Sequence, residues 1–128
     1  MKEYLLDTNF ILRFILNDNF EQVKIIRDYF TQAKNREITL NVPLLVVPEV
    51  LFALTRFNNI KKEKATKFLF EFINLPYLNV NFREILNQVF PKYMKMNLSF
   101  VDLFLYFQAK SEGIELLTFD EKLRKLKI

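Results

Sequence analysis

The chain has 128 residues, of which 51% are hydrophobic, so it can bury one core but leaves little room for a second ordinary domain. It contains no Cys and no His, which excludes disulfides, thiolate zinc sites, cysteine nucleophiles and Ser/His/Asp triads. Its formal charge of +4 mildly favours a polyanionic partner, and any catalysis must use carboxylates, hydroxyls, amides, Lys, Arg or a bound ion.

The first part of the chain alternates predicted strands and helices. A short strand over residues 2–7 ends at Asp7, and residues 8–17 follow as a helix with an apolar stripe. Pro43 and Pro48 flank the entry into a helix that runs to about Arg56, since Pro is tolerated in a first helical turn. The other elements predicted here are helices at 21–34 and 61–73 and strands at 38–42 and 77–80.

The last part of the chain contains the clearest helix, at residues 99–112, which has a hydroxyl at its start and Gly113 at its end. A helix over 83–94 precedes it, and Pro91 is expected to kink that helix or end it early. Residues 114–117 are predicted as a strand. Residues 120–127 form either a short basic helix or a terminal extension, and an edge strand at 126–128 stays open.

This alternation indicates βαβ units, and hence one α/β domain over residues 1–128 with a parallel sheet and helices on both faces. In such a sheet the functional crevice lies outside the carboxyl ends of the strands, where Asp7 and Asp120 both follow short apolar runs. The N-terminus lacks the apolar core of a signal peptide and no apolar run approaches ~20 residues. We therefore expect a soluble, cytoplasmic protein.

Four acids are the candidate functional residues, and each also has a structural explanation. Asp7 and Asp120 could cap the helices that follow them, Asp102 could complete a capping box with Ser99, and Glu49 could favour the positive end of its own helix.

The surroundings of two acids favour a functional role. Every residue from 100 to 107 except Asp102 is apolar, which predicts a helix buried nearly all round. Glu49 is predicted to lie on a core-facing stripe, because the residues three and four positions away are Leu45, Val46, Phe52 and Ala53. A carboxylate left there without a partner would cost several kcal/mol.

Lys and Arg cluster on polar faces and offer no matching buried cation, so the acids need another counter-charge. A hard divalent cation such as Mg²⁺ or Mn²⁺ takes oxygen ligands and fits this requirement. Two such ions about 4 Å apart could activate water on one side of a phosphodiester and stabilise the leaving oxygen on the other. This chemistry needs no His.

The pattern resembles the PIN-domain nucleases, and within them the toxin branch called VapC. The resemblance covers essentially the whole chain. Its parts are Asp7-Thr8-Asn9 after the opening strand, a helical Glu49, Asp102 early in a late helix, and Leu116-Leu117-Thr118-Phe119-Asp120 after Gly113.

The resemblance implies a three-layer α/β/α sandwich with a central parallel sheet of four or five strands. It also implies an endoribonuclease that uses one or two Mg²⁺ or Mn²⁺ ions, forms a homodimer and is neutralised by a cognate antitoxin docking on the helices from 43 to 73. Carried over by position, the catalytic and metal-binding acids are Asp7, Glu49, Asp102 and Asp120, with Asn9 and Thr118 as supporting polar groups.

Two departures from the family pattern concern the terminus and the aromatic residues. The chain is short after Asp120, which leaves the strand count open. The helices of residues 43–73 are rich in Phe; most of these side chains are expected in the core, and some on a dimer or antitoxin surface. They are Phe52, Phe57, Phe68, Phe70 and Phe72.

The same residues do not fit three other classes of α/β protein. A haloacid-dehalogenase-type phosphotransferase needs an Asp where Asn9 stands, a receiver domain needs adjacent acids near Asp7, and a single Gly cannot make a phosphate-binding loop. The alternatives that stay open are an RNA- or protein-binding module without turnover, and an RNA-processing nuclease that is not a toxin. Basic side chains could guide RNA or simply be solvated; they are Lys61, Lys62, Lys64 and Lys67, and Lys122, Arg124, Lys125 and Lys127.

Overall fold

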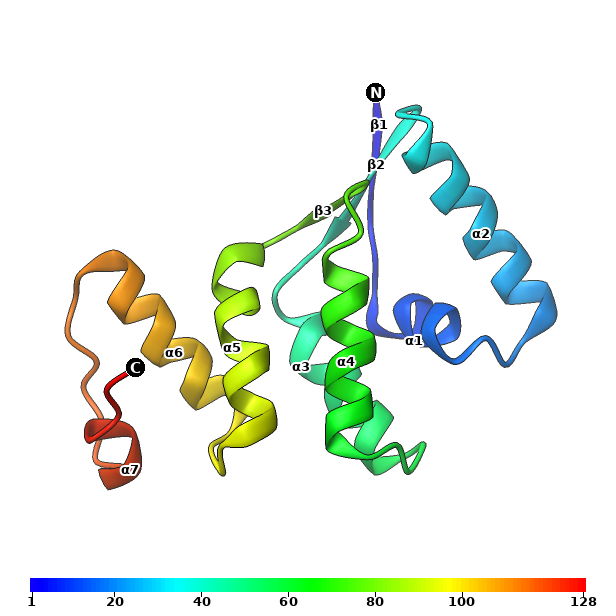
Figure 1. Cartoon of the computed structure of the whole chain (residues 1–128). Helices are drawn as coiled ribbons and strands as arrows, with labels where there is room; N and C mark the ends of the chain where they lie inside the picture. The colour runs from blue at the N-terminus through cyan, green and yellow to red at the C-terminus, as the bar shows by residue number, and fades with distance from the viewer. The chain divides into compact units, whose positions relative to one another are not determined.

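A computed structural model describes all residues from 1 to 128, which form two compact units, Met1–Asn81 and Phe82–Ile128. The first unit contains the sheet and four helices, and the second is helical (Figure 1). Together they have three strands and seven helices. None of the helices combines the length and hydropathy needed to cross a membrane.

The sheet of the first unit has three parallel strands in the order β1-β2-β3. They are β1 (Lys2–Leu5), β2 (Ile38–Val42) and β3 (Leu78–Val80). β2 is central, and its Leu40 and Val42 are buried. Because all strands run the same way, their carboxyl ends lie at one edge, where Leu5 pairs with Asn41 and Val42 with Val80.

The helices of this unit connect one strand to the next. Figure 1 shows α1 (Thr8–Leu16) at the carboxyl end of β1 and α2 (Phe20–Lys34) returning along the sheet to the start of β2. An aromatic cluster forms around Phe30 of α2. The centroid of its ring lies 4.4 Å from that of Phe14, 6.2 Å from that of Phe72 and 6.1 Å from that of Tyr77. Burial raises the pKa of Tyr77 above its ordinary value. The other two helices of this unit are α3 (Val46–Arg56) and α4 (Lys62–Ile73).

The second unit is built on two packed helices, α5 (Arg83–Lys95) and α6 (Phe100–Glu112), followed by the short α7 (Glu121–Arg124). Leu86, Val89, Phe90 and Leu103 are fully buried in its core. Of the two outcomes expected at Pro91, a kink or an early end of the helix, the early end is contradicted, because α5 continues to Lys95. Loss of one backbone donor at Pro91 does not outweigh the packing of the helix on α6.

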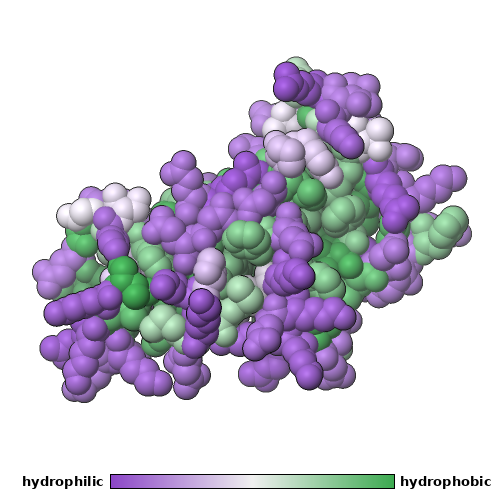
Figure 2. Space-filling model, in the orientation of Figure 1, coloured by the Kyte–Doolittle hydropathy of each residue, from purple (hydrophilic) through white to green (hydrophobic).

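The predicted sheet of four or five strands was also wrong, because the structure has three. Residues 114–117 form no strand, nor do residues 126–128. A strand exists only where a neighbour satisfies its N–H and C=O groups, and here residues 114–117 have no such neighbour. Ile114 and Leu117 are exposed, and Figure 2 shows several such apolar residues at the surface among hydrophilic ones.

We predict that Phe30→Ala lowers the free energy of unfolding by about 3–5 kcal/mol, because it leaves a cavity among four aromatic rings, those of Phe10, Phe14, Phe72 and Tyr77. Urea denaturation followed by circular dichroism measures this. Phe20→Ala is the control, since Phe20 is 85% exposed and its loss should change stability by less than about 0.5 kcal/mol. Equal stability losses in the two variants would show that the cluster is not part of the core.

Candidate metal centre

Asp7 lies where β1 ends and α1 begins, at the carboxyl edge of the sheet. Its backbone is extended, with φ −93° and ψ 173°, and its carboxylate Oδ1 accepts a hydrogen bond of 2.8 Å from the backbone N–H of Phe10. Asp7 is therefore the N-cap of α1, as its structural explanation required. The side chain is exposed, and Oδ2 does not take part in the capping bond.

Glu49 lies in the first turn of α3, which begins four residues after the central strand β2 ends. Its Oε2 accepts a hydrogen bond of 2.9 Å from the hydroxyl Oγ1 of Thr8, the residue next to Asp7. Because β1 and β2 are parallel neighbours, the helices that follow them start at the same edge, and this bond connects the two starts. The structure thus brings Glu49 to the neighbourhood of Asp7.

The prediction that Glu49 faces the core was wrong, because its side chain is exposed. Two of the apolar residues that supported it, Leu45 and Phe52, are themselves exposed. α3 is apolar on more than one face, so spacing alone does not identify the buried one. The face that packs inward carries Val47, Val50, Leu51 and Leu54.

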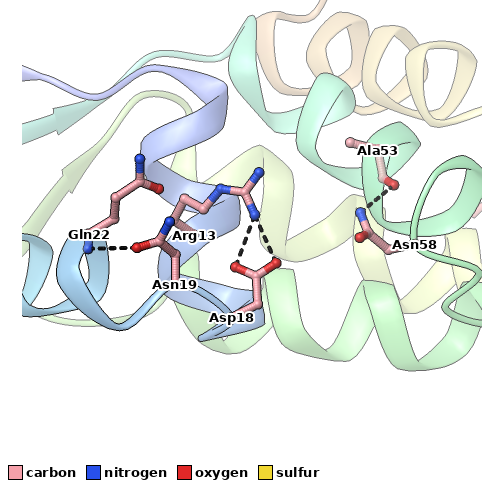
Figure 3. A network of polar contacts seen from close by, with 6 residues as sticks. All are labelled: Arg13, Asp18, Asn19, Gln22, Ala53 and Asn58. Carbon is pink, nitrogen blue, oxygen red and sulfur yellow. Dashed lines mark hydrogen bonds and ion pairs between the residues drawn. The ribbon is translucent and has the colours of Figure 1, made fainter.

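A pocket of about 230 Å³ opens beside Asp7, between α1 and α2, and the candidate supporting residue Asn9 lies in its wall. Arg13 also lines the pocket, but its guanidinium Nη1 contacts both carboxylate oxygens of Asp18 at 2.8 and 2.9 Å (Figure 3). Gln22, another lining residue, donates its backbone N–H to the Asn19 side chain at the start of α2. Arg13 and Gln22 were not predictable from the sequence, because the packing of α1 on α2 that brings them together has no sequence motif.

In the second unit, Asp102 is the third residue of α6. Its backbone N–H donates to the Ser99 hydroxyl at 3.1 Å, which is the Ser half of the expected capping box. The prediction that this helix is buried nearly all round was wrong, since Val101 and Leu105 are exposed. α6 buries one face, at the helical spacing of Phe100, Leu103, Phe104 and Phe107.

Asp120, also in the second unit, is the N-cap of α7. Its Oδ1 accepts a hydrogen bond of 2.9 Å from the backbone N–H of Leu123. The hydroxyl of Thr118 accepts a bond of 3.1 Å from the backbone N–H of Asp120 itself, which fixes the turn before the helix. Thr118 thus positions Asp120, and Asp120 also serves as the cap that its structural explanation required.

The four acids have the same kind of local environment, each within its own unit, because each lies at the N-terminal end of a different helix. Unpaired N–H groups and the helix dipole stabilise negative charge there. Neither unit by itself contains three acidic side chains grouped to hold a metal ion. The donors that are available are carboxylate, hydroxyl and amide oxygens, a set that suits a hard divalent cation such as Mg²⁺ and no thiolate- or imidazole-bound metal.

The first unit is therefore of the α/β class, and two of its acids, Asp7 and Glu49, lie at the starts of the helices that follow the adjacent strands β1 and β2. The sequence model of the PIN domain family matches residues 4–128, and the chain therefore belongs to that family. No curated protein and no solved structure matches it. PIN domains are generally nucleases, and the family typically uses divalent metal ions.

We expect two substitutions at Asp7 to differ in stability. Asp7→Ala removes the cap and should cost about 1 kcal/mol of unfolding free energy, whereas Asp7→Asn keeps an oxygen acceptor and should cost only a few tenths. Thermal unfolding of both variants in chelator measures the difference. If Asp7→Asn were as destabilising as Asp7→Ala, the capping bond to Phe10 would not explain the stability contribution of Asp7.

Proposed function

We propose that this chain is a Mg²⁺- or Mn²⁺-dependent endoribonuclease that hydrolyses RNA phosphodiester bonds. The observation that carries the proposal is the hydrogen bond from Thr8 to Glu49, which holds the candidate ligand Glu49 next to the residue that follows the candidate ligand Asp7, in a chain of the PIN family. One or two ions would be held by Asp7, Glu49, Asp102 and Asp120.

The chain's own groups have definable roles in this proposal. Thr8 occupies Oε2 of Glu49 and orients that carboxylate, while the capping bond occupies Oδ1 of Asp7. The remaining oxygens, Oε1 of Glu49 and Oδ2 of Asp7, are the ones we assign to the cation. A bound divalent ion supplies charge to stabilise the phosphodiester oxygens and lowers the pKa of an attacking water.

We further propose that both units make one domain and that Asp102 and Asp120 complete the site. Two observations support this. One family model spans both units, and the two acids of the second unit occupy the same kind of helix start as Asp7 and Glu49. Crowded carboxylates repel one another, so such a site needs a cation for stability.

The finer identity is also a proposal: the toxin of a VapC-type pair, acting in the cytoplasm as a homodimer and neutralised by an antitoxin. The surface proposed for the antitoxin is formed by residues 43–73, where Leu45 is exposed just before α3. A neighbouring gene for a small DNA-binding protein, or its absence, tests the pairing directly.

We predict RNA cleavage with Mg²⁺ or Mn²⁺ and none in chelator. Asp7→Asn and Asp102→Asn should each lower the rate by at least about 100-fold, because each removes a charged ligand from the cation. Labelled RNA separated on gels measures the rate. The matched control is Asp28→Asn, which changes an exposed acid on α2. Cleavage that persists in chelator or in Asp7→Asn rules out the nuclease, whereas RNA binding without any cleavage identifies a binding module.

Millimolar Mn²⁺ should raise the melting temperature of the wild-type chain. An ion present at tenfold its dissociation constant contributes about 1.4 kcal/mol, or a rise of about 3–6 °C for a chain of this size. Asp7→Asn should lose most of this rise. A wild-type melting curve that does not move with Mn²⁺ contradicts a shared cation site.

A further inference from the structure

The end of α3 carries an exposed aromatic and cationic cluster, Phe52, Arg56 and Phe57, which we call the α3 platform. Phe57 is 76% exposed and Phe52 is 49% exposed. Their ring centroids lie 6.0 Å apart in an edge-to-face arrangement, and the Arg56 guanidinium lies 5.0 Å from the Phe52 centroid. Single exposed apolar residues are ordinary, whereas rings that lie together at a surface form a patch of the kind that marks interaction sites.

The turn that carries this platform is held in place by hydrogen bonds. The Ala53 carbonyl accepts a hydrogen bond of 3.0 Å from the side-chain amide of Asn58 (Figure 3). It also accepts the backbone N–H groups of Phe57 and Asn58, at 3.1 and 3.3 Å. The next residue, Asn59, has a positive φ of 52°, which Asn tolerates better than most residues. Phe57 is therefore presented on a fixed backbone, which reduces the entropy lost when a ligand stacks on it.

The charge around the platform is positive. Arg56 and the start of α4 supply four cationic side chains against one acid, Glu63. Lys64 repeats the pairing of cation and ring, with its Nζ 5.6 Å from the Phe68 centroid. The other cations are Lys61 and Lys62, both candidate RNA-binding residues.

The platform shares one helix face with Glu49. Phe52 and Arg56 follow Glu49 by three and seven residues, a spacing that places all three on one side of a helix. All three side chains are exposed. With a rise of about 1.5 Å per residue, Arg56 lies roughly 10 Å along the helix axis from Glu49. A strand of nucleic acid that reaches the candidate metal centre can therefore extend over the platform.

We propose that the α3 platform binds single-stranded RNA by stacking bases on Phe57 and the Arg56 guanidinium, while neighbouring lysines contact its phosphates. Every base has a π-face, so this contact selects single strands over duplexes without selecting sequence. The choice of RNA rests on the proposed function. Other occupants, a protein partner or a second copy of the chain, would use the same rings without needing the cations.

The test is fluorescence anisotropy of the full chain with a short labelled oligouridylate in chelator, where no cleavage is expected. Phe57→Ala should weaken binding by about 5- to 100-fold, the value of one stacked base. Phe20→Ala is the matched control, since Phe20 is an equally exposed ring on α2, and its affinity should stay within about twofold of wild type. Arg56→Lys should weaken binding while leaving the salt dependence unchanged, because it keeps the charge and loses the planar group.

The same measurement with duplex RNA distinguishes stacking from charge. Duplex affinity should change less than about twofold in Phe57→Ala, because paired bases do not expose their faces. An oligouridylate affinity that stays at the wild-type value, or single-strand and duplex affinities that fall equally, would overturn the proposal. So would a Phe57→Ala variant that changes only the oligomeric state in light scattering, because that would assign the platform to a second copy.

The binding experiments test the α3 platform independently of the cleavage experiments, which test the nuclease site. If Asp7→Asn cleaves RNA normally, the nuclease site is wrong, yet binding in chelator still reports on the platform. If cleavage depends on Asp7 and Phe57→Ala leaves both KM and binding unchanged, the platform is wrong and the nuclease stands. Circular dichroism spectra of both Phe variants should match the wild type, because each ring is exposed.

Discussion

The start of a helix is the constraint on which the candidate site depends. Four backbone N–H groups at each helix start lack partners within the helix, and an acid in the first turn satisfies one of them or complements the dipole. Asp7 and Asp120 do this through side-chain hydrogen bonds to Phe10 and Leu123. In a parallel sheet the helix that follows a strand starts at its carboxyl end. The residues that start helices therefore gather at one edge, and the hydrogen bond from Thr8 to Glu49 shows this for β1 and β2.

This constraint makes the structural and functional explanations of the acids compatible. A capping bond uses one carboxylate oxygen, as Oδ1 of Asp7 and Oδ1 of Asp120 show, and leaves the second for another ligand. Asp7 can therefore cap α1 with one carboxylate oxygen and bind a metal ion with the other. The cap fixes the rotamer of the side chain, and a fixed rotamer is what a metal ligand requires.

The sequence predicted features that depend on a few neighbouring residues. The Ser99 cap, the Gly113 terminus and the caps Asp7 and Asp120 were all predictable from local spacing, and the structure confirms them. The β1, β2 and β3 regions were predictable from apolar runs. The strand at 114–117 had the same kind of signal, but strand formation depends on pairing with a remote segment, which composition does not report.

Features that depend on tertiary packing could not be predicted from the sequence. The bond between Thr8 and Glu49 spans 41 residues and follows from the parallel register of two strands. Apolar residues around Glu49 suggested burial, yet Leu45 and Phe52 face solvent. The face of α3 that was expected to be buried, and is exposed, is also the face that carries Phe52 of the α3 platform. An apolar stripe on a helix that already buries Val47, Val50, Leu51 and Leu54 is a second stripe, and it has no core left to enter. Its exposure beside Glu49, with the Arg56 guanidinium over the Phe52 ring, therefore argues for a ligand outside the chain.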